Sequence, residues 1–283
     1  MSRDWVETEH PRWPAETPGG RGGEFRGDDA PDGWLTQTAG GLLQGFMTHR
    51  QLLTYVGRTD YEEGGHIGGG SSITRVREYS DGTRLVAKEH EYSESAANEV
   101  TASYIARAIG APAPAVAYAD QDPASDDTTT LSQFIVGDAA ANHIHGWSDW
   151  DEFAEKQSEL AMNIPGSFEI GLLDLLIHNT DRHSGNWLIT PPEGRFGGRR
   201  AVAIDHGHAD VGNRYAESIS SPFIDWFYTD YGTPTDISGA ITRAELDAID
   251  ARFQHLQDIG AISTPTRRKL AAHIRDLKRR TDR

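Results

Sequence analysis

The chain has 283 residues, a formal net charge of -16 at neutral pH and no cysteine. A chain of this length can bury the core of one bilobal domain or of two small domains, and the lack of cysteine excludes disulfides, thiolate nucleophiles and cysteine-based zinc sites. The acidic balance disfavours sequence-independent binding to nucleic acid and stable association with an anionic membrane. Because the N-terminus has no apolar signal core and no apolar run approaches the ~18 residues that span a bilayer, we expect a soluble, cytoplasmic protein.

Residues 1–60 are expected to form a flexible N-terminal arm and a lead-in to the folded part. The first forty or so residues are rich in Gly, Pro, Arg and Asp and show neither helical nor strand periodicity. Within them, EHPRWPAETPGGRGGEF resembles segments near the ends of head and tail proteins of tailed phages. That resemblance implies a virion partner and a virion-associated location; the alternative is a linker without a role of its own.

A small β-rich lobe is predicted for residues 61–137. The glycine-rich stretch GGHIGGGSS leads into two β-rich segments around Asp81-Gly82, the strongest short hairpin signal. SESAANEVTASYIARAIG has helical spacing and ends at Gly110, a C-terminal cap. AVAYAD and TTTLSQFIVG are two further strands, and residues 134–137 are the expected hinge.

The remaining residues, 138–283, predict a helical lobe, so the fold class is α+β and bilobal. SDWDEFAEKQSELAMN opens on a Ser148 cap and SFEIGLLDLLIHN on Ser167. WLIT and AVAID are short apolar strands, and two or three helices follow from about Thr242. The basic end of the chain is interpreted as a solvated helix face.

Residues suited to binding phosphates occur in the small lobe. A glycine-rich turn brings backbone N–H groups close to a polyphosphate without obstruction by Cβ atoms. Lys88, in the strand LVAKEHE, can reach the same phosphates, and Glu99 in the following helix can hold the lysine as an ion-pair partner, with Glu91 and Glu94 as competitors. The predicted loop contacts are Gly69, Gly70, Ser71 and Ser72.

The stretch HNTDRHSGNWLI, followed by RRAVAIDHGHAD, carries the residues suited to catalysis. Phosphoryl transfer needs a base or orienting group near the attacking hydroxyl, together with oxygen ligands for a divalent metal. Asp181 or His183 can act on the hydroxyl. Asn186 and Asp205 can supply the amide and carboxylate oxygens that bind Mg²⁺ or Mn²⁺.

The pair DRHxxN and IDxGH resembles the catalytic and metal-binding loops of the phosphatidylinositol 3-/4-kinase family and its prokaryotic or phage relatives, with HipA-type kinases more distant. The resemblance spans residues 64–230. It implies a bilobal protein-kinase-like fold that binds ATP, with the adenine against the hinge. It also implies these roles: Asp181 and His183 as the catalytic pair, Asn186 and Asp205 as metal ligands, Lys88 as the phosphate contact, and Phe134 and Val136 as nucleotide-binding hinge residues.

Two departures from the family pattern limit what the resemblance implies. His206 stands where the family usually has phenylalanine, and the large accessory domains of lipid kinases have no counterpart in these residues. An acidic protein also suits an anionic lipid surface poorly. We therefore expect the hydroxyl of a protein or small molecule as phosphate acceptor. Two alternatives stay open: an inactive kinase-fold binding protein or phage structural component, and an enzyme of the same fold that transfers AMP.

Overall fold

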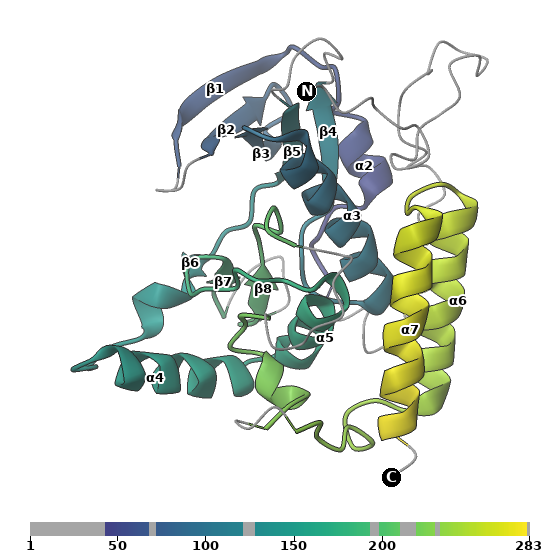
Figure 1. Cartoon of the computed structure of the whole chain (residues 1–283). Coiled ribbons are helices and arrows are strands. Elements are labelled where there is room, and N and C mark those ends of the chain that lie inside the picture. Colours follow the sequence, from purple (N-terminus) through teal and green to yellow (C-terminus); the bar gives the residue numbers. More distant parts are fainter. Residues whose placement is uncertain are drawn as a thin grey trace.

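The computed structural model describes residues 43–67, 72–120, 128–192, 198–209, 219–229 and 233–281. Figure 1 shows a lobe built on a twisted sheet above a lobe dominated by helices, with α6 and α7 packed side by side along one edge. The α+β bilobal class expected from the sequence is confirmed. The predicted N-terminal arm, including its phage-like stretch, and Gly69, Gly70 and Ser71 of the glycine-rich loop lie outside the described residues.

The upper lobe contains a five-stranded sheet in the order β1-β2-β3-β5-β4, in which every neighbouring pair is antiparallel. Its strands are β1 Tyr61–His66, β2 Ile73–Tyr79, β3 Arg84–His90, β4 Val116–Asp120 and β5 Thr128–Gln133. The predicted hairpin is confirmed, because Gly82 adopts a positive φ of 78° and the Thr83 N–H donates to the Asp81 carboxylate at 2.9 Å. Strand β1 was not predicted. It is an almost wholly exposed edge strand, so it lacks the apolar alternation that reveals a half-buried strand.

The two faces of this sheet have different neighbours. Leu85, Ala87 and Leu131 pack on one face with Leu52 of helix α2 (His49–Leu53), a short helix that begins with a capping box at Thr48. Because side chains alternate along a strand, Lys88 lies on the opposite face of β3. Helix α2 escaped prediction because five residues carry too little helical periodicity to be recognised.

Helix α3 (Ser93–Ile109) crosses between the lobes and contacts the sheet, α5 and α6. It ends as the sequence predicted, at Gly110, which has a left-handed φ of 79° and whose N–H closes the last turn. Ten of its residues are buried, among them the charged residue Glu99. Because a buried carboxylate requires a partner, Glu99 is expected to pair with a polar or charged group between the lobes.

The lower lobe combines a second sheet, in the order β6-β7-β8, with most of the helices. Its elements are β6 Asp138–Ala139, the 3-10 helix η2 Ala140–His143, α4 Trp150–Met162, α5 Ser167–Ile177, β7 Trp187–Ile189, β8 Ala201–Ala203, the 3-10 helix η4 Ile224–Trp226, α6 Arg243–Asp258 and α7 Thr264–Arg280. Trp187, Phe223, Phe227 and Phe253 are fully buried in its core. Helix α5 lies inside this core and leads directly into the DRHSGN loop.

Two predicted helix caps are wrong by one residue. Helix α4 is capped by the Asp149 carboxylate, which accepts from the Glu152 N–H at 2.9 Å, whereas Ser148 instead bonds the Glu152 carboxylate. Helix α5 is preceded by Gly166 at a φ of 92°, and Ser167 is its first residue. A Cβ atom at position 166 would meet the ring of Pro112 at 2.7 Å, so this position needs glycine both for its conformation and for its space.

The basic C-terminal helix is less solvated than we expected. On α7, Lys278 and Arg267 pair with Asp247 and Asp250 of α6 at 2.6 and 2.9 Å. Arg280 is buried, donates to the Phe227 carbonyl and stands 5.0 Å from the centre of the Tyr228 ring. The long basic side chains therefore pack this helix onto its neighbours, because their apolar stems cover surface while their charged ends find partners.

Among the described residues, no single helix combines the length and apolar composition of a membrane span; α4 and α5 meet that criterion only as a pair, bent by 110° between them.

Two buried histidines should make the stability of the fold depend on pH. His49 stacks on Tyr104 at 3.8 Å and bonds Ser103, and burial lowers its pKa from 6.5 to about 3; burial also lowers the pKa of His90, to about 4. Between the lowered and the ordinary pKa the unfolded chain binds more protons than the folded one. We expect the free energy of unfolding to decrease as the pH falls below about 6.5, by up to about 1.4 kcal/mol per pH unit for each histidine.

Urea unfolding at pH 7 and pH 5 measures this effect. In His49→Gln, which keeps a polar side chain that does not titrate, the loss of stability between the two pH values should be smaller than in the unmodified protein. An equal loss in both proteins would show that His49 does not contribute to the acid response.

Candidate active site

Lys88 connects the two lobes at the centre of the site. Its Nζ atom lies 2.6 Å from Oε1 of Glu99 on α3 and 2.7 Å from Oδ1 of Asp205, the second residue after β8. The predicted roles require that Lys88 and Asp205 can both reach one triphosphate, and the 2.7 Å between Nζ and Oδ1 meets this requirement. Of the three carboxylates considered for Lys88, Glu99 is the partner in the structure; Glu91 and Glu94 are exposed.

The charges at this centre are strongly coupled. Burial acts to raise the pKa of Asp205, but the Lys88 ammonium outweighs it and lowers that pKa to about 2. Burial raises the pKa of Glu99, and Lys88 offsets part of the rise. For Lys88 itself, burial acts to lower the pKa and the two carboxylates raise it above its ordinary value. One ammonium therefore faces two carboxylates, and the centre lacks one positive charge for balance.

In the DRHSGN loop the side chains of Asp181 and His183 are exposed to solvent, whereas the side chain of Asn186 is buried and hydrogen-bonded to Asp181. The side chains of Asp181 and His183 are 43% and 60% exposed, with Nε2 of His183 4.0 Å from the Asp181 carboxylate. The Gly185 N–H donates to Nδ1 of His183 at 3.0 Å, so the neutral imidazole carries its proton on Nε2. In that tautomer Nε2 is protonated and Nδ1 already accepts a hydrogen bond, so His183 has no free proton-accepting atom, whereas the exposed Asp181 carboxylate has one.

Asn186 is bonded in a way that suits a metal ligand. Its amide nitrogen donates to the backbone carbonyl of Asp181 at 2.8 Å and to the Asp181 carboxylate at 3.3 Å. Both bonds use the nitrogen, so neither occupies the amide oxygen, which is the atom that binds Mg²⁺. The Ile204 N–H donates to the Asn186 carbonyl at 3.1 Å and so holds the two predicted ligand loops together.

Arg182 is the main connection between these loops, and no role was predicted for it. Its guanidinium, 1% exposed, pairs with Asp174 of α5 at 3.0 Å, donates to the carbonyls of Asn186 and Ile204, and donates to Nδ1 of His206 at 2.8 Å. Asp174 also accepts from Asn179 and Ser221. The lone carboxylate in the apolar helix GLLDLLI was a signal, because a buried charge requires a partner.

His206 packs where the family resemblance anticipates phenylalanine. It is 1% exposed and accepts from Arg182 through Nδ1, and its backbone N–H donates to the Glu99 carboxylate. The preceding residue, Asp205, has a positive φ of 56°, which is uncommon outside glycine and characteristic of functional sites. The imidazole of His206 therefore accepts a hydrogen bond from Arg182 that a phenylalanine at this position could not accept.

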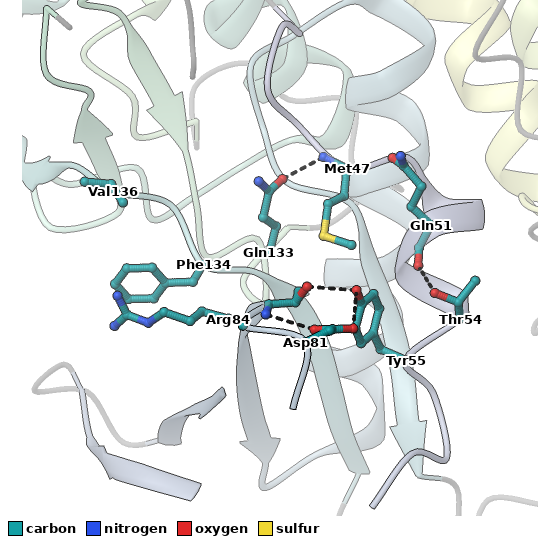
Figure 2. A pocket seen from close by; sticks show the side chains of 11 residues that line it. Met47, Gln51, Thr54, Tyr55, Asp81, Arg84, Gln133, Phe134 and Val136 are labelled. Atoms are coloured by element: carbon teal, nitrogen blue, oxygen red, sulfur yellow. Dashed lines mark hydrogen bonds between the residues drawn. The ribbon is translucent and has the colours of Figure 1, made fainter. Parts of the chain in front are cut away.

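A pocket of about 480 Å³ lies on the α2 side of the sheet and beside the hinge, away from this centre. Figure 2 shows hydrogen bonds among the residues that line it: the Gln133 side chain accepts from the backbone N–H of Met47 at 2.6 Å, and the Tyr55 hydroxyl bonds the side chains of Asp81 and Thr83. None of Lys88, Asn186 and Asp205 lines it. The pocket is therefore separate from the centre formed by Lys88, Asn186 and Asp205.

The hinge residues predicted to bind nucleotide border this pocket. Phe134 donates its N–H to the Arg84 carbonyl at 3.2 Å and carries the Arg84 guanidinium over its ring, while Val136 is 54% exposed. Ser72, the described residue of the predicted phosphate loop, lies directly before β2 and is half-buried. The contact between adenine and the hinge stays a prediction, and so does the contact between the phosphates and the glycine-rich loop.

The candidate ligands suit Mg²⁺, which binds partly through substrate and water, better than they suit a metal ion that is coordinated by protein side chains alone. Among the described residues, no group of three or more His, Asp or Glu side chains is placed to hold a metal ion. The candidate ligands are one carboxylate, from Asp205, and one amide oxygen, from Asn186. Mg²⁺ is commonly held by one or two protein ligands together with substrate phosphates and water, and this donor set matches that pattern.

Comparison with known proteins gives short sequence matches and distant structural ones. No family model matches the chain. It is 34% identical over 101 residues to phosphatidylinositol 4-kinase gamma 5 of Arabidopsis thaliana, covering 35% of this chain and 13% of that protein, and 38% identical over 63 residues to phosphatidylinositol 4-kinase gamma 6, covering 21% and 9%. The matches thus span about a tenth of the length of these relatives.

Two bacterial kinases are among the similar solved structures. The Helicobacter pylori proinflammatory kinase CtkA has a TM-score of 0.48 at 13% identity and covers 81% of this chain and 97% of its own. The Mycobacterium tuberculosis PknI kinase domain, as a double mutant, has a TM-score of 0.36 at 12% identity and covers 80% and 97%. The structure itself combines a lysine–glutamate pair between the lobes with a DRHxxN loop that is hydrogen-bonded to the segment carrying Asp205, which is the arrangement expected from the sequence.

Proposed function

We propose that the chain is an ATP-dependent phosphotransferase that moves the γ-phosphoryl group of ATP to the hydroxyl of a protein or small molecule. The observation that carries this proposal is the position of Lys88, within 2.7 Å of both Glu99 and Asp205. A lysine held by a helix glutamate beside a metal-binding aspartate is what phosphoryl transfer requires, because one group must contact the phosphates and another the metal.

Each residue of the site has a distinct part in this proposal. Lys88 contacts the phosphates and Glu99 keeps it in position, while Asn186 and Asp205 hold Mg²⁺ or Mn²⁺, which neutralises charge on the phosphates when bound. Asp181, oriented by His183, accepts the proton of the attacking hydroxyl. The predicted glycine-rich loop covers the phosphates, and the backbone of the hinge contacts the adenine.

Electrostatics supports a strict need for the divalent ion. The chain carries a net charge of -16, and Lys88 is already paired with two carboxylates. ATP without metal would bring further negative charge to a centre that lacks a balancing positive one. We therefore expect nucleotide binding to depend on Mg²⁺ or Mn²⁺.

Incubation with ATP labelled at the γ- or the α-phosphate tests the type of reaction. A phosphotransferase passes the γ-label to an added hydroxyl acceptor, or to itself, and never the α-label. Transfer of the α-label would identify an AMP transferase on the same fold. Retention of neither label, together with binding of nucleotide, would identify an inactive kinase-fold binding protein.

The predicted division of labour in the DRHSGN loop can be measured separately. Asp181→Asn and His183→Ala should each lower turnover by roughly 10² to 10⁴-fold yet keep nucleotide affinity, because a proton acceptor contributes mainly in the transition state. Asn186→Ala should lower both turnover and affinity, because a metal ligand also contributes to the ground-state complex.

A thermal-shift series with Mg-ATP provides the readout for affinity. Asp181→Asn and His183→Ala should be stabilised by Mg-ATP as the unmodified protein is, and Asn186→Ala less. If all three variants lost stability together, and Mg-ATP did not stabilise even the unmodified protein, the loop would be a structural brace and the assignment of an active site would be wrong.

A further inference from the structure

Helix α4 is packed far less than the other long helices. Only one of its residues, Ala161 near its C-terminal end, is buried. In Figure 1 it extends from the lower lobe, with its N-terminal end farthest from α5 and the core. A helix that contributes so little to the core is free to present its other side chains to a partner.

The N-terminal end of α4 carries a cluster of three aromatic side chains. Trp147 and Trp150 stack with ring centroids 5.8 Å apart, and Phe153 meets both edge-on at 5.3 and 5.7 Å. Trp150 is 75% exposed and Trp147 is 44% exposed. Two exposed tryptophans side by side are unusual on a soluble surface and are characteristic of interaction sites.

The cluster is held on a rigid base. Asp149 caps the helix, and Ser148 is bonded through both its N–H and its hydroxyl to the Glu152 carboxylate at 2.7 and 2.8 Å. Lys156 donates to the carbonyls of His145 and Gly146 at 3.1 and 2.6 Å, which fixes the chain that leads into the helix. The aromatic rings are therefore presented in a preformed arrangement, and little ordering is needed when a partner binds.

The charges around the rings are almost all negative. The segment from residue 147 to residue 162 has a single basic side chain, Lys156, which is engaged by Glu152 and the two carbonyls. Its acidic residues are Asp149, Asp151, Glu152, Glu155 and Glu159. Aromatic faces attract cations, and neighbouring carboxylates strengthen that attraction.

We propose that Trp147, Trp150 and Phe153, with the carboxylates of α4, form a docking site for an arginine- or lysine-rich segment of the protein that accepts the phosphoryl group. The acceptor role rests on the proposed function, whereas the docking itself needs no catalysis. Two other occupants fit poorly. An anionic membrane would be repelled by the carboxylates, and the chain's own residues 1–42 contain four arginines against eight acidic residues.

The docking site is connected to the catalytic loop. The Ala141 N–H of η2 donates to the carbonyl of Ser184, within DRHSGN, at 3.2 Å. Trp147 follows Ala141 by six residues, so the two Cα atoms are at most roughly 20 Å apart. A docked segment can therefore deliver a hydroxyl from a nearby part of the same protein to Asp181.

Binding of short unstructured peptides tests the proposal, with tryptophan fluorescence and calorimetry as readouts. An arginine-rich peptide should bind, and the same peptide with glutamine for each arginine should bind at least about tenfold more weakly. Trp150→Ala should lower the affinity for the arginine-rich peptide by about tenfold. Tyr92→Ala removes another aromatic side chain, 64% exposed and outside the cluster, and should leave the affinity unchanged.

The contribution of charge is tested by Asp151→Asn with Glu155→Gln, two carboxylates that do not cap the helix. This variant should bind the peptide more weakly and with less dependence on salt. Asp205→Asn should bind it as the unmodified protein does, so loss of phosphotransfer and loss of docking are distinguishable.

Several results would overturn the docking proposal. One is equal affinity for the arginine and glutamine peptides, and another is peptide binding that Trp150→Ala leaves intact. Binding to phosphatidylcholine vesicles through Trp150 without peptide binding would assign the cluster to a membrane. A dimer that Trp150→Ala dissociates would assign it to a second copy of the chain.

Discussion

Asp205→Asn should abolish turnover, with a loss of at least about 10³-fold, and weaken Mg-nucleotide binding. The substitution keeps the shape of the side chain but removes the charge that pairs with Lys88 and that we propose binds the metal. Because Lys88 retains Glu99 as a partner at 2.6 Å, the fold should survive and the effect should be confined to the site. Initial rates with labelled ATP and calorimetry on the same preparation measure both quantities.

Asp81→Asn is the matched control for this substitution. Asp81 also accepts from a basic side chain, Arg58 at 3.0 Å, but it lies at the hairpin turn, in the pocket away from Lys88. Its neutralisation should leave turnover unchanged. If Asp205→Asn kept normal activity, the metal would not be held by this carboxylate and the proposed mechanism would be wrong.

Arg182→Met should lower the free energy of unfolding by about 3–5 kcal/mol, because it leaves the Asp174 carboxylate buried without its charged partner. Both side chains of this pair are fully buried. The variant also removes the hydrogen bonds from Arg182 to Asn186, Ile204 and His206. The protein that remains folded should therefore have a lower catalytic rate. Denaturant unfolding of the purified variant gives the loss of stability.

An exposed ion pair provides the comparison. Arg279 pairs with Asp276 at 2.8 Å on α7, with the two side chains 72% and 48% exposed. Arg279→Met should change the stability by less than about 1 kcal/mol. A similarly small effect for Arg182→Met would show that the buried network does not hold the two loops together.

The centre of the site could be predicted because its residues stand at recognisable places in the sequence. Asp205 ends the apolar run AVAID, Asp181 and Asn186 follow an apolar helix, and the spacing of these polar residues resembles that of a known family. Choosing Glu99 among three carboxylates depended on knowing which face of α3 is buried. The sequence favoured Glu99 by position, and the structure shows it 5% exposed.

The connections behind the site could not be predicted in the same way. Arg182 bonds residues up to 24 positions away, and such contacts leave no local periodicity. Two of the missed elements, β1 and α2, are an exposed edge strand and a five-residue helix, which carry little apolar pattern. Both helix caps were misplaced by one residue because several residues able to cap stand side by side, and only the backbone geometry selects one.

Calorimetric titration of the protein with ATP, in the presence and absence of Mg²⁺, tests the central claim most directly. The claim is that Lys88, Asn186 and Asp205 together form a site for a metal–nucleotide complex. We expect clear binding with Mg²⁺, much weaker binding without it, and loss of the difference in Asp205→Asn. Equal affinity for ATP under all of these conditions, or no binding in any of them, would contradict the claim.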